Sequence, residues 1–337
     1  MKPPPQRFRV AVLFGGGGAE RSVSVASAVQ VVTALRERGH QADAFDTGEG
    51  RLGPAEQESG PRTPVAAVPL ALAALRHGRV SPRLVQELLD ADVIFLALHG
   101  GAGENGVIQA ILDTAGPPYT GSGRLASTIA MDKDLTKRLL RAAGIQTAPW
   151  RLLRAADTVT DLPPFDGPMV VKPNAQVSSI GLSLVREHEQ LPVAVRLARA
   201  HDADVLVERF VPGREFVVGV LDGVPLAVGE ILLGDKAIFD YEARCRAGES
   251  LHDFPADISA GLQGKLQSLA VRVHATLRLG AYSRVDFRMD HEGGIWCLEA
   301  NTLPALTATS FFPQSAQAAG VSFPDLCERI CRLAVRA

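Results

Sequence analysis

Apolar residues along the chain gather in short runs, and polar, glycine-rich turns separate these runs. The runs at 8–14, 93–98 and 169–173 are almost continuously apolar, which is typical of strands buried on both faces of a sheet. A helical periodicity follows the first run through residues 29–35 and recurs up to about residue 91. Strands therefore alternate with helices in the first third of the chain, which predicts a parallel α/β sheet there.

A different pattern, strict alternation, runs through residues 283–301. A polar turn at Glu292-Gly293 separates two alternating runs, which predicts a β-hairpin. This turn places Asp286 opposite Glu299 and Arg284 opposite Asn301, all on one face. The other face then carries the apolar residues Val285, Phe287, Met289, Trp296, Leu298 and Ala300.

Two carboxylates that face each other across the hairpin point to a bound metal. Like charges directly opposite on a sheet are destabilising, because paired side chains lie only about 5 Å apart. A divalent cation offsets that repulsion, and Mg²⁺ takes oxygen ligands while it keeps room for water and phosphates. We therefore interpret Asp286, Glu299 and Asn301 as a magnesium site for a phosphate-bearing substrate. A solvated polar face is the alternative.

Composition narrows the class of protein. A chain of 337 residues with 46% hydrophobic content can bury a large core, and its length predicts two or three domains. A net charge of −2 gives no field that would attract nucleic acid or an anionic membrane. The sequence has no apolar run of transmembrane length, residues 1–7 do not form a signal-peptide core, and the four cysteines lack a Cys-x-x-Cys spacing. We expect a cytoplasmic protein.

Glycine-rich loops follow two of the buried strands, at 15–24 and 99–106. The carboxyl ends of parallel strands share one edge of a sheet, so both loops point to one ligand site. A tight turn between strand and helix is the alternative for the first loop. Glu20, at the predicted helix start, could hold a substrate ammonium group, and an ordinary first-turn charge is the alternative. His99 is either a substrate contact or a loop residue.

The middle of the chain carries features expected of a nucleotide site. The stretch 119–123 predicts a hinge and a domain boundary before a helix from about 125 to 143, with Lys133 exposed on it. Lys172 lies in an apolar strand, which is costly unless it meets an anion, and the small-residue loop 174–181 could fold over phosphates.

Glu208 and Glu215 lie seven residues apart around a break in the strand pattern. The strand backbone there could contact a base, and a carboxylate could accept hydrogen bonds from ribose hydroxyls. An ordinary amphipathic strand pair is the alternative. The segment 234–255 lacks a regular pattern, as a mobile lid over a reaction centre would.

Taken together, these motifs resemble those of the D-alanine–D-alanine ligases of the ATP-grasp superfamily. They appear in the family's order over nearly the whole chain. The motifs are Gly15-Gly16 with 19–24, Ala97-Leu98-His99-Gly100, 119–123, Met131-Asp132-Lys133, Val171-Lys172-Pro173, Asp240-Tyr241-Glu242-Ala243, Arg284-Val285-Asp286 and 298–304.

The resemblance implies an α+β ATP-grasp fold with a Rossmann-like α/β domain at residues 1–123. A central ATP-grasp subdomain at 124–212 and a carboxyl-terminal one at 213–337 would hold ATP between them. The implied enzyme is a homodimeric carboxylate-amine ligase that serves peptidoglycan precursor supply. ATP phosphorylates the carboxylate of one D-alanine, and the amine of a second D-alanine attacks the acylphosphate.

The resemblance also assigns roles to individual residues. Lys133 and Lys172 would bind phosphates, Glu208 and Val211 the adenine, Glu215 the ribose, and Asp286, Glu299 and Asn301 the Mg²⁺, with Mn²⁺ as an alternative ion. Glu20 would hold the first ammonium group, and His99 would lie beside its carboxylate. Arg284 and the N–H of Ala305 would stabilise the oxyanion, Ser310 would anchor the second carboxylate beside Phe311, and Ser178 would link Glu20 to the lid.

The chain departs from the family pattern mainly around the acceptor and the lid. The usual Lys-Tyr of the lid is Arg244-Cys245, the phosphate loop begins with Gln176 rather than Glu, and Ala305 replaces Gly. The nucleotide and metal residues are kept, which favours a working ligase over an inactive copy. The alternatives are a ligase that makes a different dipeptide or depsipeptide, and a non-catalytic nucleotide-binding paralogue.

The lid departure generates a test. A thiol is shorter than a phenol and a weaker hydrogen-bond partner, so Cys245→Tyr should raise the rate of D-alanyl-D-alanine formation. The rate would be measured by mass detection of the dipeptide. An unchanged rate would reject this account of the lid.

Overall fold

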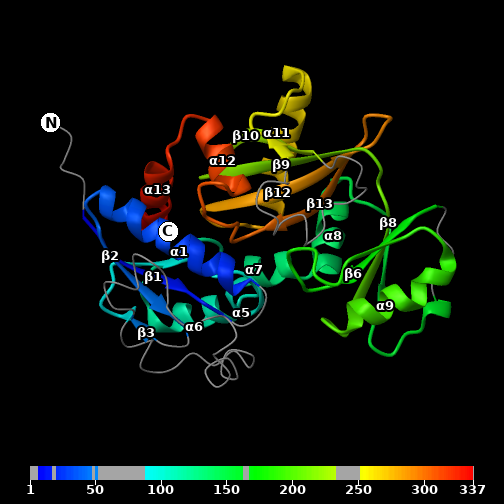
Figure 1. Ribbon diagram of the computed structural model, residues 1–337, viewed down its shortest axis with the longest axis horizontal. Helices are drawn as coiled ribbons and strands as arrows, with labels where there is room; N and C mark the ends of the chain where they lie inside the picture. The colour runs from blue at the N-terminus through cyan, green and yellow to red at the C-terminus, as the bar shows by residue number, and fades with distance from the viewer. Residues whose placement is uncertain are drawn as a thin grey trace.

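The computed structural model describes residues 7–16, 20–47, 50–51, 88–161, 167–232 and 251–336. In these residues the strands form three sheets, and Figure 1 shows them in three parts of the molecule. The amino-terminal sheet has the order β3-β2-β1-β4, with β1 parallel to β2 and β4, which confirms the predicted parallel α/β arrangement. Its elements are β1 (Arg9–Phe14), α1 (Arg21–Glu37), β2 (Gln41–Asp46), β3 (Gly50–Arg51), β4 (Val93–Leu96), α5 (Gly101–Glu104) and α6 (Val107–Ala115).

The central sheet is antiparallel and has the order β5-β8-β6-β7. Helix α9 covers it, and its apolar face packs on the sheet residues Met169, Val171 and Val207. The predicted strand at 169–173 is confirmed as β6. The elements here are β5 (Trp150–Leu153), η1 (Val159–Asp161), β6 (Met169–Pro173), β7 (Ser183–Val185), η2 (His188–Gln190), α9 (Leu191–Arg199) and β8 (Val205–Arg209).

The third sheet is also antiparallel, with the order β11-β10-β9-β12-β13. Strands β9 and β10 are joined at Asp222 and Gly223, which both have positive φ, as a tight hairpin turn requires. The end of the predicted lid segment is a strand, β11, which pairs with β10. The elements are β9 (Arg214–Leu221), β10 (Val224–Leu232), β11 (Leu251–Asp253), α11 (Ala260–Thr276), β12 (Tyr282–Met289), β13 (Ile295–Asn301), α12 (Phe311–Ala318) and α13 (Phe323–Arg336).

The single helix predicted from about 125 to 143 is wrong. The chain forms two helices there, α7 (Arg124–Met131) and α8 (Lys133–Ala142). Asp132 interrupts them with an extended backbone, and its carboxylate caps α8 by accepting from the N–H of Leu135 at 3.0 Å. The break turns Lys133 inward, so this residue is buried rather than exposed as predicted.

The predicted hairpin register is confirmed at the end that carries Asp286 and Glu299, and it is wrong at the turn end. Asp286 lies opposite Glu299 and Arg284 opposite Asn301, as predicted. One residue further, a β-bulge shifts the pairing, so that Phe287 lies opposite Cys297. Cys297 is therefore buried in the core in place of the predicted Leu298, and Trp296 lies opposite Arg288.

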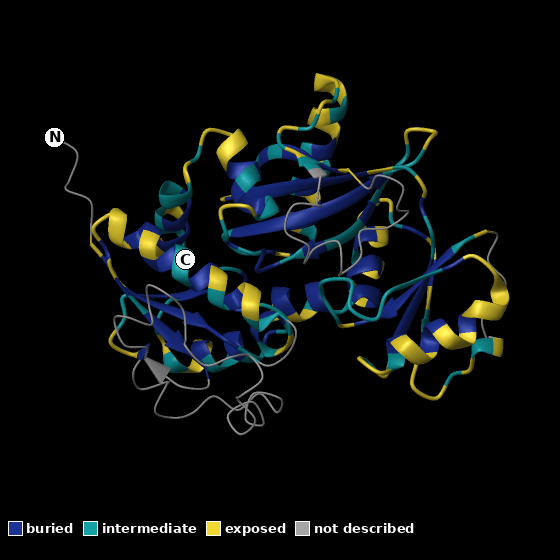
Figure 2. Cartoon of the chain, viewed as in Figure 1, coloured by how far each residue is buried: buried dark blue, intermediate teal, exposed yellow. Residues whose placement is uncertain are grey.

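The largest apolar cluster joins the two ends of the chain. It combines the amino-terminal sheet with α13, whose residues Leu326, Cys327, Ile330 and Cys331 are fully buried. Figure 1 shows α13 beside α1, and Figure 2 shows the buried inner faces of these elements. The carboxyl-terminal helices therefore stabilise the amino-terminal sheet, and the three predicted domain ranges remain a proposal.

This shared core generates a stability prediction. Leu326→Ala should lower the free energy of unfolding by about 2–5 kcal/mol, because it leaves a cavity beneath α13. Urea denaturation would measure the loss. Leu197→Ala in α9 is the matched control, since Leu197 is 54% exposed and should change stability by less than about 1 kcal/mol. Equal effects of the two substitutions would contradict the docking of α13.

Candidate active site

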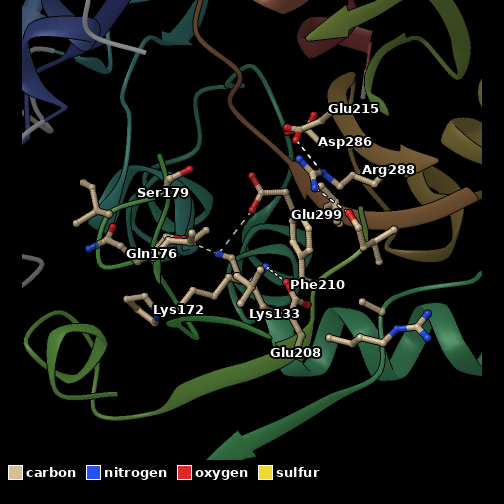
Figure 3. Close-up of a pocket in the computed structure, with 18 residues that line it drawn as sticks. Lys133, Lys172, Gln176, Ser179, Glu208, Phe210, Glu215, Asp286, Arg288 and Glu299 are labelled. Carbon is tan, nitrogen blue, oxygen red and sulfur yellow. Dashed lines mark hydrogen bonds and ion pairs between the residues drawn. The ribbon is translucent and has the colours of Figure 1, made fainter. Parts of the chain in front are cut away.

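A pocket lies between the central sheet and the third sheet, and it gathers most of the predicted nucleotide and metal residues. Lys133 comes from the start of α8, Lys172 from β6, Glu208 from β8, and Asp286 from β12. Figure 3 shows these side chains converging on the pocket. The lining residues that sequence analysis predicted are Lys133, Lys172, Glu208, Val211, Glu215, Asp286 and Glu299.

A buried ion cluster forms the floor of the pocket. Glu208 accepts from the ammonium of Lys172 at 2.6 Å, and its other oxygen lies 2.8 Å from the ammonium of Lys137. Burial alone would raise the pKa of Glu208, but the two lysines lower it to about 2. Burial opposes the charge on Lys172, yet the pKa of Lys172 is raised because Glu208 and Glu299 outweigh that effect. Lys172 is therefore a cation held ready for an anionic ligand.

Lys133 completes the positive side of the pocket. Its ammonium donates to the carbonyl of Gln176 and lies 3.9 Å from the carboxylate of Glu299. Burial lowers the pKa of Lys133, and the neighbouring charge of Lys172 adds to that shift. A triphosphate would supply the negative charge that this pair of lysines favours.

The predicted metal ligands lie on one face of the hairpin. Asp286 and Glu299 are cross-strand partners, and both line the pocket. Arg284 offsets part of their repulsion by donating to both oxygens of Asp286, at 2.7 and 2.8 Å. Asn301 lines an adjoining pocket with Glu299 and Lys133, and its Oδ1 accepts from the N–H of Leu303 at 2.8 Å.

These donors suit a hard divalent cation. Carboxylate and amide oxygens are the ligands that Mg²⁺ prefers, and the pocket leaves space for phosphates beside them. Among the described histidine, cysteine and acidic side chains, no group of three could hold a metal ion. The predicted set consists of two carboxylates and one amide, and water and phosphate oxygens would complete it.

Glu215 lines the pocket from β9 and lies opposite Arg288 of β12. Gly213 has a φ of +130°, and a Cβ there would overlap the carbonyl of Met289, so only glycine lets β9 approach β12 so closely. This contact brings Glu215 and Val211 alongside Arg288. Phe210 and Leu298 add apolar walls that suit a base.

Glu20 and Ser178 meet across the boundary between the amino-terminal and central parts. The hydroxyl of Ser178 donates to Glu20 Oε1. Gly100 approaches the same carboxylate so closely that a Cβ there would overlap it. Ser178 and Ser179 both have a φ of +57°, a strained conformation that is concentrated in ligand-binding loops.

His99 lies one residue from this contact. Its Nε2 is 3.2 Å from the hydroxyl of Ser27, and its Nδ1 is 3.8 Å from Glu104. Glu104 in turn accepts from the N–H of Gly100 at 3.0 Å. His99 is therefore fixed in place beside Glu20, where a substrate carboxylate could reach it.

The remaining predicted residues lie at the start of α12 and in the loop before it. The ring of Phe311 lies beneath the guanidinium of Arg284, 5.7 Å from ring centre to carbon. Ser310 precedes α12, and its hydroxyl is 2.7 Å from that of Thr307. Ala305 is half-buried in the loop between β13 and α12. Cys245, the lid stretch 240–245 and residues 17–19 lie outside the described residues.

Sequence analysis missed three residues of the site. Lys137 follows Lys133 by four positions, so helical spacing could have placed both on one face. Arg288 follows Arg284 and Asp286 at alternate positions of β12. The alternation of side chains along a strand could therefore have placed Arg288 on the same face as these two residues. Glu104 gave no signal, because its role depends on the fold of the loop after β4.

Models of one protein family match both halves of the chain. The D-ala D-ala ligase N-terminus model matches residues 9–122, and the D-ala D-ala ligase C-terminus model matches residues 139–332. The chain is 39% identical over 325 residues to the D-alanine–D-alanine ligase of Geobacter sulfurreducens, which covers 96% of this chain and 92% of the relative. It is 38% identical over 327 residues to that of Gloeobacter violaceus, with coverages of 96% and 98%.

Solved structures agree with the family models. The D-alanine–D-alanine ligase of Bacillus anthracis complexed with ATP superposes with a TM-score of 0.75 at 26% sequence identity, and the match covers 98% of this chain and 97% of that one. The predicted α+β ATP-grasp fold is thereby confirmed. The chain belongs to the D-alanine–D-alanine ligase family.

Proposed function

We propose that this protein joins two D-alanine molecules at the expense of ATP, through an acylphosphate. The observation that carries the proposal is the set of charges that line one pocket. Lysines 133 and 172 form its positive side, and the carboxylates of Asp286, Glu299 and Glu215 line it as well. These charges suit a triphosphate with its metal ion and its ribose.

The pocket residues would act mainly by position and charge. Lys133 and Lys172 would hold the phosphates and stabilise the negative charge that develops during phosphoryl transfer. Asp286, Glu299 and Asn301 would hold Mg²⁺, or Mn²⁺ in its place, which neutralises charge on the phosphates. Glu208 and the main chain at Val211 would contact the adenine.

The amino-acid side would use the residues around Glu20 and Arg284. Glu20, held by Ser178, would bind the ammonium of the first D-alanine, and His99 would lie beside its carboxylate. Arg284 and the N–H of Ala305 would stabilise the oxyanion when the second amine attacks. Ser310 and the start of α12 would hold the second carboxylate.

Family membership also supports three proposals about the oligomeric state, the location and the cellular role of the protein. We propose a homodimer, a cytoplasmic location and a role in peptidoglycan precursor supply. None of the helices in the described part of the chain has the length and apolar character of a membrane span. Light scattering during size exclusion would test the dimer, and a monomer at micromolar concentration would reject it.

The decisive experiment is ADP release across a panel of amino-acid pairs, with mass detection of the product. D-Alanine with itself should give ADP and one dipeptide, and D-serine, D-lactate and L-amino acids should give less. A higher rate with another acceptor would replace D-alanine as the second substrate. Saturable Mg-ATP binding without ADP release from any pair would reject catalysis.

The metal assignment generates a separate prediction. Glu299→Gln should reduce ADP release by at least about 100-fold, because an amide is a weaker Mg²⁺ ligand than a carboxylate. Glu292→Gln is the matched control, since Glu292 lies in the turn of the same hairpin and is exposed. If the Glu299 variant kept wild-type activity, the metal site would be wrong.

A further inference from the structure

Arg288 is the one arginine of β12 to which the family resemblance assigned no role, although it lines the nucleotide pocket and is only 3% exposed. It shares the pocket face of β12 with Arg284 and Asp286, because alternate residues of a strand point the same way. A buried arginine is costly unless its donors are satisfied, so its contacts indicate what it serves.

Three contacts fix the guanidinium of Arg288. Its Nε donates to Glu215 Oε2 at 3.1 Å, and its Nη1 donates to the carbonyl of Val211 at 2.7 Å. Its carbon lies 5.0 Å from the ring centre of Phe210, where the ring face favours a cation. Figure 3 shows Arg288 beside Glu215 at the edge of the pocket.

The direction of these contacts gives Arg288 a specific role. The carbonyl of Val211 and the ring of Phe210 hold the guanidinium, and the guanidinium then orients the carboxylate of Glu215. Arg288 and Glu215 are also direct cross-strand partners, so the strand register itself sets their separation. A carboxylate that is held in one orientation can accept from ribose hydroxyls without first being ordered.

We infer that Arg288 is the positioning residue for the ribose of the nucleotide and that it acts through Glu215. It therefore sets the preference for ATP over triphosphates that lack ribose hydroxyls. This inference rests on the proposed function, because it takes ATP as the occupant of the pocket.

The experiment must separate two effects of replacing Arg288: the loss of ribose positioning and the loss of a positive charge near the triphosphate. Removing a cation weakens the binding of any triphosphate, so a higher KM for ATP alone would not identify the role of Arg288. The ratio of kcat/KM for ATP to that for 2′,3′-dideoxyATP cancels this shared effect. The same ratio of dissociation constants, measured by calorimetry, does not depend on turnover.

In the wild type we expect a preference for ATP of about tenfold or more, since a site built for hydroxyls rejects the analogue without them. Arg288→Met should reduce the preference to within about threefold and raise the KM for ATP about tenfold, with little change in kcat. Arg288→Lys keeps the charge but loses the fork of donors, so it should give an intermediate preference.

Arg214 provides the matched control. It donates to both oxygens of Glu230, at 2.7 and 2.6 Å, and lies 5.0 Å from the ring of Phe216. This arginine thus has the same kinds of partner as Arg288, one position from Glu215 but outside the nucleotide pocket. Arg214→Met should leave the preference for ATP unchanged.

The variants also keep the two proposals apart. If Arg288→Met does not fold, Arg288→Lys keeps the buried charge and carries the test, because its preference should still fall below that of the wild type. A full wild-type preference in Arg288→Met or Arg288→Lys that collapses in Glu215→Gln would overturn the inference and leave the proposed function intact. A preference that survives Glu215→Gln would instead reject the ribose assignment itself.

Discussion

Buried charge is the constraint on which the rest of the site depends. Lys137, Glu208 and Lys172 form one cluster beneath the pocket, and each is at most 8% exposed. Removing one member of such a cluster leaves an uncompensated buried charge, which costs about 3–5 kcal/mol. The fold therefore fixes Lys172 in place before any ligand arrives. Catalysis benefits, because charges that are already oriented need no reorganisation in the transition state.

The hairpin shows how one inserted residue can serve two purposes. On the side of Asp286 the register keeps two carboxylates together, which suits a metal. Beyond the bulge, Cys297 packs into the core while Leu298 lines the pocket. Trp296 donates to Asp290 at 2.7 Å and stacks beneath Arg209 at 4.8 Å. The bulge thus separates a polar half, which carries the predicted metal ligands, from a half that closes the turn and forms an apolar wall.

Much of this arrangement could be predicted from the sequence, because its signals are local. A lysine in an apolar strand and two carboxylates in register both violate the ordinary pattern, so Lys172, Asp286 and Glu299 were found. The break at Asp132 was missed because a periodic pattern continues on both sides of one capping residue. The bulge was missed because one extra residue in a strand hardly changes the number of apolar residues in the strand, so the alternating pattern still looks regular. The docking of α13 depends on a partner some 300 residues away in sequence, which no local pattern can reveal.

The two sides of the site differ in how they are held. The loop after β4 and the start of α12 contribute Leu98 and Phe312 to the large cluster that joins both ends of the chain, so packing fixes the proposed amino-acid side. The loop 174–181 belongs to the central part, and it reaches the amino-terminal part through the hydrogen bond from Ser178 to Glu20. Because Glu20 would also bind the ammonium of the first substrate, substrate binding and the position of this loop use the same carboxylate. The geometry would thus couple the proposed amino-acid site to the loop 174–181 through the carboxylate of Glu20.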